Sequence, residues 1–100
     1  MEIDLILEDQ IEVIVAEVKT TLTIEAVNEF LDDLATFCAF FPAYITYHIY
    51  GAVAGLDIPH DVARYAYRRG LYVVSVSGEN MVKILNDEKF YPRDFQPHPS

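Results

Sequence analysis

Two carboxylates and one amine near the start of the chain are the side chains best suited to chemistry: Asp4, Glu17 and Lys19. Lys19 is the only basic residue among the first 63, a region that holds 12 of the 16 carboxylates. Mg²⁺ prefers hard oxygen ligands and keeps several of its waters, so one or two carboxylates suffice to hold it. A lysine within reach can orient an attacking water or offset the charge that builds on a phosphorane. The trio therefore fits the metal-dependent hydrolysis of a phosphodiester.

The same three residues also have a structural explanation. A glutamate and a lysine two residues apart on one face of a strand can form a modest surface ion pair, worth roughly 0–1 kcal/mol. An aspartate close to a chain end can simply be solvated. The choice depends on whether the fold brings Asp4 to the strand that carries Glu17 and Lys19.

Two strands are predicted to carry these residues. Residues 2–8 alternate imperfectly between polar and apolar, as a strand with one buried face does, and residues 8–10 indicate a turn. Residues 11–19 are rich in β-branched side chains and are apolar from 13 to 16, which is typical of an interior strand covered on both faces. Two strands joined by a tight turn form an antiparallel hairpin.

The length of the hairpin loop decides on which face Asp4 lies. If Glu8 pairs with Ile11 across a two-residue loop, Asp4 lies opposite Val15 and diagonal to Glu17. Diagonal partners are roughly 7–8 Å apart at the backbone, so the two carboxylates can converge on one ion from the face that also carries the lysine. A three-residue loop would send Asp4 to the other face.

The rest of the sequence predicts an α/β domain. Thr23 is placed to cap a helix whose apolar residues recur at helical spacing, and Pro42 ends that helix. Asp57 caps a second helix with Pro59 in its first turn, and Gly70 supplies the left-handed C-cap. The order β-β-α-β-α-β-β, with a parallel crossover from the second strand to the third, predicts a mixed sheet with helices packed on it. The elements predicted after the hairpin are a helix at 24–41, a strand at 46–54, a helix at 57–69, a strand at 71–76, a turn at 77–80 and a strand at 81–85.

With these elements in place, the sequence resembles a known superfamily. Glu2-Ile3-Asp4, a hairpin, and then Glu17-Val18-Lys19 is similar to the motif of the PD-(D/E)xK nucleases, which share the restriction-endonuclease-like fold. In that family the aspartate opens the second core strand, the E-x-K lies on the third, and a helix and a parallel strand follow. The resemblance covers nearly the whole chain. It extends to the C-terminal domain of uncharacterised prokaryotic members that often carry an N-terminal coiled coil, through the stretches at 50–55, 63–66, 69–71 and 84–87.

The resemblance implies roles for five residues. Asp4 and Glu17 would bind Mg²⁺ or Mn²⁺, with the Val18 carbonyl as a third ligand, and Lys19 would be the catalytic lysine. Glu2 would be a supporting carboxylate. The implied activity is the hydrolysis of DNA, which makes DNA the expected partner.

One part of the family core is expected to be missing. The core usually begins with a helix before the first motif strand, whereas this chain starts only a few residues before Asp4. The chain is then a fragment, a minimal version, or a domain whose missing layer comes from another subunit. An apolar sheet face or edge would be left uncovered, which predicts a homodimer. The same absence favours an alternative function, a catalytically inactive nuclease-like domain that serves dimerisation or protein interaction.

Length and composition set further bounds. One hundred residues make a single domain, predicted to span 1–95 with a frayed tail at 96–100. No apolar run approaches the roughly 20 residues that span a bilayer, and the acidic N-terminus lacks the features of a signal peptide, so a cytoplasmic protein without membrane contact is expected. The single cysteine, Cys38, excludes an intrachain disulfide and is expected to be a core residue on a helix. The three histidines are too scattered to form a zinc site.

The charge is spread unevenly along the chain. A net charge of −9 counts against a protein that holds nucleic acid by electrostatics alone. Six of the seven cations lie within 64–100, so a phosphate-facing surface would draw on that half and on Lys19. Arg64 and Arg68 lie one helical turn apart and can meet phosphates, but a solvated face in which Asp61 pairs with Arg64 is the plainer explanation.

Overall fold

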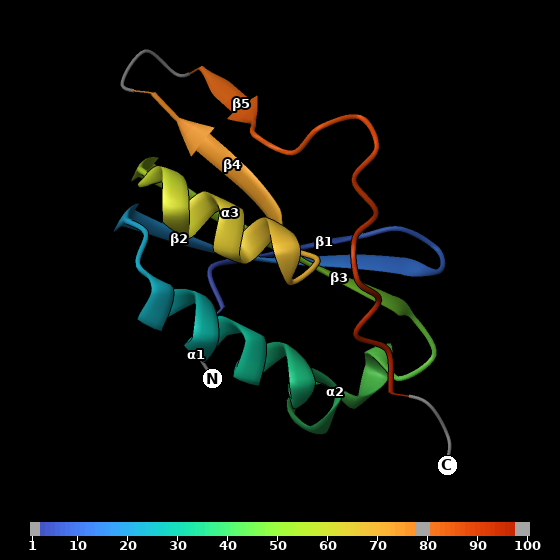
Figure 1. The fold of residues 1–100 in the computed structure, drawn as a ribbon. Coiled ribbons are helices and arrows are strands. Elements are labelled where there is room, and N and C mark those ends of the chain that lie inside the picture. Colours follow the sequence, from blue (N-terminus) through green and yellow to red (C-terminus); the bar gives the residue numbers. More distant parts are fainter. Residues whose placement is uncertain (1–2, 78–80, 98–100) are drawn as a thin grey trace.

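A five-stranded mixed sheet forms one layer of the molecule, and helices form the other (Figure 1). The computed structural model describes residues 3–77 and 81–97. The strands lie in the sheet in the order in which they occur along the chain. The strands are β1 (Leu5–Glu8), β2 (Glu12–Thr21), β3 (His48–Asp57), β4 (Tyr72–Val76) and β5 (Val82–Ile84), and the helices are α1 (Ile24–Ala35), α2 (Phe37–Phe40), the 3-10 helix η1 (Pro42–Tyr44) and α3 (His60–Arg68).

The pairing of the strands makes this an α/β protein, as predicted. β1 and β2 form the expected antiparallel hairpin. β2 and β3 are parallel and joined through the α1 to η1 segment, and β3 and β4 are parallel and joined through α3. β5 pairs antiparallel with β4. The predicted mixed sheet and its parallel crossover are therefore confirmed.

The register of the hairpin differs by two residues from the prediction. Glu8 pairs with Val13 and not with Ile11. The Ile11 carbonyl instead accepts the N–H of His48, at 2.8 Å, at the start of β3, so it belongs to the ladder on the other side of β2. A shift by two residues keeps the alternation of faces, which is why the expected face of each β1 side chain is unchanged.

The single helix predicted at 24–41 is broken. Thr23 caps α1 as expected, and its hydroxyl accepts the N–H of Ala26 at 3.1 Å. At Thr36 the backbone leaves the helical region (φ −112°, ψ 9°), and its hydroxyl donates back to the carbonyls of Asp32 and Asp33. Such bonding competes with the helical ladder, so α1 ends there and the short α2 begins in a new direction. Cys38 is buried on α2, as predicted, and burial raises the pKa of its thiol.

The start of the second predicted helix is also different. Asp57 is the last residue of β3 and does not cap α3. The helix begins at His60, and Pro59 occupies the N-cap position. Gly70 confirms the predicted left-handed turn after the helix, with φ +84°. The predicted turn at 77–80 lies outside the described residues except for residue 77, and Glu2 lies outside them as well.

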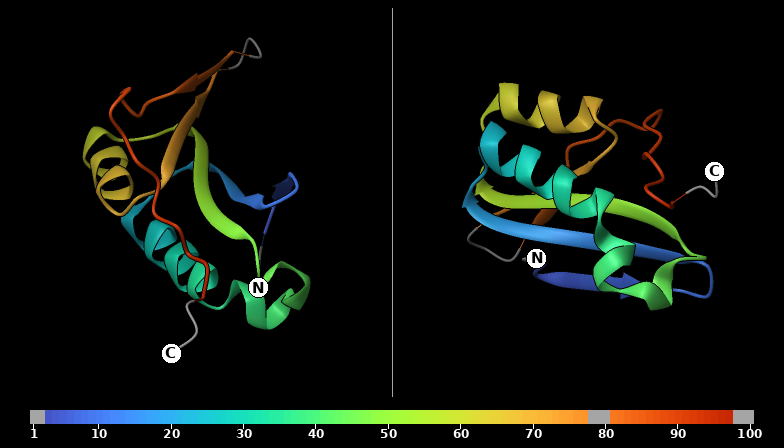
Figure 2. Two further views of the ribbon diagram at one scale, coloured as in Figure 1. Left: turned by 90° about the vertical axis from the view of Figure 1, so that its right-hand side faces the viewer. Right: turned by 90° about the horizontal axis from the view of Figure 1, so that it is seen from below.

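Both long helices cover the same face of the sheet (Figure 2). The strand residues buried beneath them occur at alternate positions, as on β2 with Val13 and Val15 and on β3 with Ile49 and Val53. They pack with the buried side chains of α1 such as Phe30 into one core. The prediction that β2 is covered on both faces is wrong for the described chain, because the intervening positions are only half-buried or exposed.

The opposite face of the sheet is apolar and carries no described helix (Figure 2). The strand register aligns the intervening residues of all five strands on this face. We call it the open face. Its most exposed apolar side chains are Leu5, Leu7, Val18, Leu56, Val82 and Ile84.

The segment after β5 returns across the molecule to the start of β3 (Figure 1). The side chain of Asn86 extends the β4 ladder, accepting from the N–H of Val73 at 2.7 Å and donating to the carbonyl of Leu71 at 3.0 Å. Further on, the N–H of Phe95 donates to the carbonyl of Ile49 at 2.8 Å. At the start of the predicted tail, the N–H of Gln96 donates to Oδ1 of Asp94 at 2.9 Å. No helix in the described ranges is long and apolar enough to cross a bilayer.

Candidate functional site

Glu17 is a carboxylate built into the packed face of a central strand. Its position on β2 continues the line of Val13 and Val15, and it lies in register with Val53 of β3. Only 5% of Glu17 is exposed, and it is the one charged residue classed as buried within the described ranges. Burying an ionised carboxylate is costly unless other groups compensate its charge. A carboxylate kept in such a position therefore requires compensation.

Lys19 supplies a positive charge beside this carboxylate. Its Nζ lies 3.4 Å from Oε1 of Glu17, and the lysine side chain is 33% exposed. The two residues occupy successive inward positions on β2, with Gly55 of β3 paired to Lys19. This ion pair therefore differs from the exposed surface pair considered from the sequence, because Glu17 is buried and only Lys19 reaches solvent.

Asp4 is bound to the backbone on both sides of Glu17. The N–H of Asp4 donates to the carbonyl of Ala16 at 3.2 Å, and Oδ2 of its side chain accepts the N–H of Val18 at 2.7 Å. These two peptide groups flank Glu17. Asp4 is exposed to solvent, but its carboxylate is not simply solvated, because it accepts from a backbone N–H just before β1 begins.

The structure thus places four of the five predicted site residues at the open end of the β1–β2 hairpin: Asp4, Glu17, Val18 and Lys19. The fifth, Glu2, lies outside the described residues. Two carboxylates and one backbone carbonyl are hard-oxygen groups of the kind that Mg²⁺ and Mn²⁺ accept. Within the described ranges there is no group of three or more histidine, cysteine, aspartate or glutamate side chains that could hold a metal ion.

The sequence did not predict a second acid–base pair, which His48 and Asp94 form. Nδ1 of His48 lies 2.6 Å from Oδ2 of Asp94, and Oδ1 of Asp94 accepts the N–H groups of Ile49 and Gln96. Burial alone would raise the pKa of Asp94, but these hydrogen bonds and the His48 ring lower it below its usual value. The two residues are 46 positions apart, so no local pattern in the sequence could reveal the pair.

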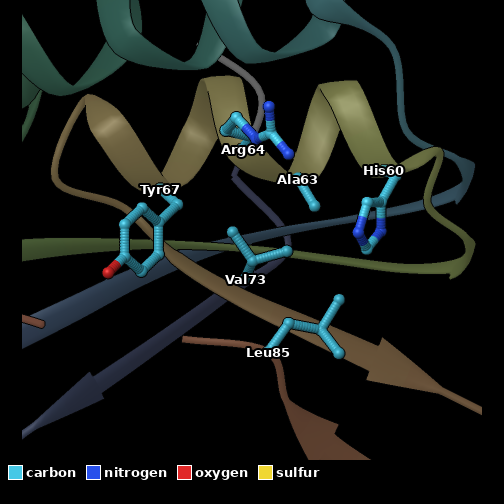
Figure 3. A pocket seen from close by; sticks show the side chains of 6 residues that line it. All are labelled: His60, Ala63, Arg64, Tyr67, Val73 and Leu85. Carbon is cyan, nitrogen blue, oxygen red and sulfur yellow. The ribbon is translucent and has the colours of Figure 1, made fainter. Parts of the chain in front are cut away.

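Three pockets lie away from Asp4, Glu17 and Lys19, with volumes of about 300, 250 and 520 Å³, and the third is lined in part by Asp94. The first lies between α3 and β4 (Figure 3). The second lies at the hairpin loop, and the third between α1 and the C-terminal segment. None of the three is lined by Asp4, Glu17 or Lys19.

Asp4, directly before β1, is thus held by hydrogen bonds to β2, and Glu17 and Lys19 on β2 are joined by an ion pair. No protein-family model, curated protein or solved structure matches the chain.

Proposed function

We propose that the chain is a metal-dependent DNA phosphodiesterase of the PD-(D/E)xK type. The observation that carries the proposal is the attachment of Asp4 to the two peptide groups that flank Glu17, next to Lys19. A hairpin, a helix and a parallel strand follow one another around this site, which is the arrangement that the sequence resemblance implies.

Each residue has a distinct proposed role. Asp4, Glu17 and the Val18 carbonyl would hold Mg²⁺ or Mn²⁺, which when bound supplies a Lewis acid that polarises a phosphoryl oxygen. Lys19 is partly exposed and lies within ion-pair distance of Glu17, so it can orient a water or stabilise negative charge near the same place. Placement on paired strands favours a fixed geometry for these groups.

Metal binding provides the first test. Titration with Mn²⁺ followed by calorimetry should show binding in the wild type and a loss of at least tenfold in affinity for Glu17→Gln and Asp4→Asn. Asparagine keeps a neutral acceptor for the Val18 N–H, so the fold around Asp4 is preserved while its charge is lost. Glu29→Gln is the matched control, because Glu29 is an exposed glutamate on α1. Equal binding in all four proteins would overturn the proposed metal site.

Cleavage of DNA provides the second test. Plasmid or branched DNA should be cut only with a divalent ion present, and the activity should disappear in Glu17→Gln, Asp4→Asn and Lys19→Met. Glu29→Gln should retain it. Cleavage in the presence of a chelator, or activity that survives both carboxylate substitutions, would contradict the proposal.

A second candidate function is supported by a different observation, the open face. In this alternative the chain is a catalytically inactive nuclease-like domain that forms a homodimer. Apolar side chains with about half or more of their surface exposed, such as Leu56 at 58%, lie on several strands of this face. A protein with a net charge of −9 repels its own copies, so self-association would use the face that is poorest in charge.

Light scattering after size-exclusion chromatography tests the dimer. The wild type should elute as a dimer, and Leu56→Asp should elute as a monomer at the same concentration. Ile45→Asp is the control, because Ile45 is similarly exposed, at 56%, but lies outside the sheet. A wild-type monomer at every concentration tested would exclude this alternative.

A further inference from the structure

One pocket of about 300 Å³ combines an apolar floor with two basic side chains at its rim. Four residues of one face of α3 line it together with two from the sheet side: His60, Ala63, Arg64, Tyr67, Val73 and Leu85. Figure 3 shows the rings of His60 and Tyr67 at opposite ends of the pocket, with Ala63 and Val73 between them. Its volume is at the lower end of the range for small-molecule sites, roughly 300–1,000 Å³.

The charge at this pocket is opposite to that of the chain as a whole. His60 and Arg64 both line it, and no carboxylate does. Neither residue takes part in an ion pair with any other described residue, and the predicted pairing of Asp61 with Arg64 does not form within that part of the chain. In a protein with a net charge of −9, Arg64 gives this pocket a positive charge that can attract an anion, and the His60 ring adds a group that can donate a hydrogen bond.

The rest of the lining favours a flat, apolar group. Tyr67 is held in place, because its hydroxyl donates to Oδ2 of Asp87 at 2.9 Å and its ring packs against Phe90 with centroids 5.2 Å apart. The other carboxylate oxygen of Asp87 accepts the N–H of Lys89, so this acid is already bonded at both oxygens. A fixed aromatic wall beside aliphatic side chains is suited to a planar ring.

One end of the pocket, at His60, lies at the edge of the sheet where β3 ends at Asp57 and α3 begins. The other end, at Tyr67, lies toward the start of β4.

We propose that this pocket binds a nucleotide unit, with its phosphate on Arg64 and His60 and its base against the apolar lining beside Tyr67. Guanidinium and imidazole groups are suited to phosphate oxygens, and an aromatic side chain accepts any base without reading its sequence. The unit is either a free mononucleotide or one nucleotide of a single strand. This binding needs no metal, so it stands apart from the proposed hydrolysis.

The test is a titration of the full chain in a chelator, followed by amide chemical shifts. Deoxyadenosine 5′-monophosphate should shift amides of α3 and β4, and deoxyadenosine should bind at least fivefold more weakly because it lacks the phosphate. Arg64→Ala should weaken nucleotide binding about fivefold to tenfold. Arg68→Ala is the matched control, because Arg68 is an exposed arginine of α3 that does not line the pocket, and it should stay within about twofold.

A short single-stranded oligonucleotide distinguishes the two sources of the nucleotide. Shifts at the same amides, with an affinity that falls as salt is raised, support a strand-binding site. Shifts with the mononucleotide alone support a site for free nucleotides. Equal binding of deoxyadenosine and its phosphate, equal effects of Arg64→Ala and Arg68→Ala, or shifts confined to other elements would overturn the proposal. The Glu17→Gln variant should bind the nucleotide with unchanged affinity. A failure of the proposed metal site can therefore be distinguished from a failure of the nucleotide site.

Discussion

Asp4 is bonded to both peptide groups that flank Glu17, through its own N–H on one side and its carboxylate on the other. This relationship fixes where β1 meets the middle of β2. Of the two acidic residues, Asp4 is exposed and Glu17 is buried.

The hydrogen bond between Asp4 and Val18 should make a measurable contribution to the free energy of unfolding. Asp4→Ala leaves the N–H of Val18 without its acceptor, and we expect the free energy of unfolding to fall by about 1 kcal/mol. Asp4→Asn keeps a neutral acceptor and should lose less than half of that amount. Urea denaturation of the three proteins at neutral pH measures the difference. An asparagine variant as unstable as the alanine variant would mean that the charge, and not the hydrogen bond, holds the strands.

The buried charge of Glu17 should cost stability. Glu17→Met replaces a carboxylate by an apolar side chain of similar length, and Lys19 can extend into water because it is already one-third exposed. We expect the free energy of unfolding to stay equal or rise by about 1 kcal/mol, while Mn²⁺ binding is lost. Denaturation and calorimetry on the same samples test both parts. A clear loss of stability would indicate that the fold itself needs the carboxylate.

The turn after α3 should not tolerate a side chain. At Gly70 the backbone has φ +84°, and a Cβ atom there would collide with Cβ and the backbone N of Arg93. Gly70→Ala should therefore lower the free energy of unfolding by about 2–3 kcal/mol. Gly55→Ala is the comparison, because the backbone at Gly55 is not left-handed. A Cβ atom added there would lie 3.1 Å from its nearest neighbour, the carbonyl oxygen of Lys19. A smaller loss at Gly70 than at Gly55 would contradict this account.

The sequence predicted those features that depend on neighbouring residues. Thr23 caps its helix and Gly70 turns left-handed because each signal acts within one or two turns of chain. The predicted hairpin register was wrong because the Ile11 carbonyl accepts a hydrogen bond from the N–H of His48 at the start of β3. Only the folded sheet creates this contact. Glu17, Val18 and Lys19 lie on β2 and Asp4 directly precedes β1, and a shift by two residues preserves the face on which each β1 side chain lies. The contact of Asp4 with Val18 could not be predicted from the hairpin pattern, because it depends on where β1 begins.

The anchor at Asp94 should make stability depend on pH in acid. Its pKa is lower in the folded protein than in the unfolded chain, so its contribution is complete above the ordinary carboxyl pKa of about 4 and is lost as the pH falls through the lower folded value. Asp94→Asn should cost about 1 kcal/mol at neutral pH. The difference between the two proteins should shrink as the pH is lowered from about 5 to about 3. A difference that stays constant over this range would show that the charge of Asp94 contributes nothing.

The return of the C-terminal segment to β3 has a consequence for synthesis of the protein. Ile49 of β3 is synthesised 45 residues before Asp94, so the bonds that Asp94 and Phe95 make to Ile49 can form only after that intervening stretch has been made. The hairpin, α1 and β3 are therefore synthesised before the segment that anchors the start of β3. The interval before these bonds form is the time when the nascent sheet is most exposed to misassembly.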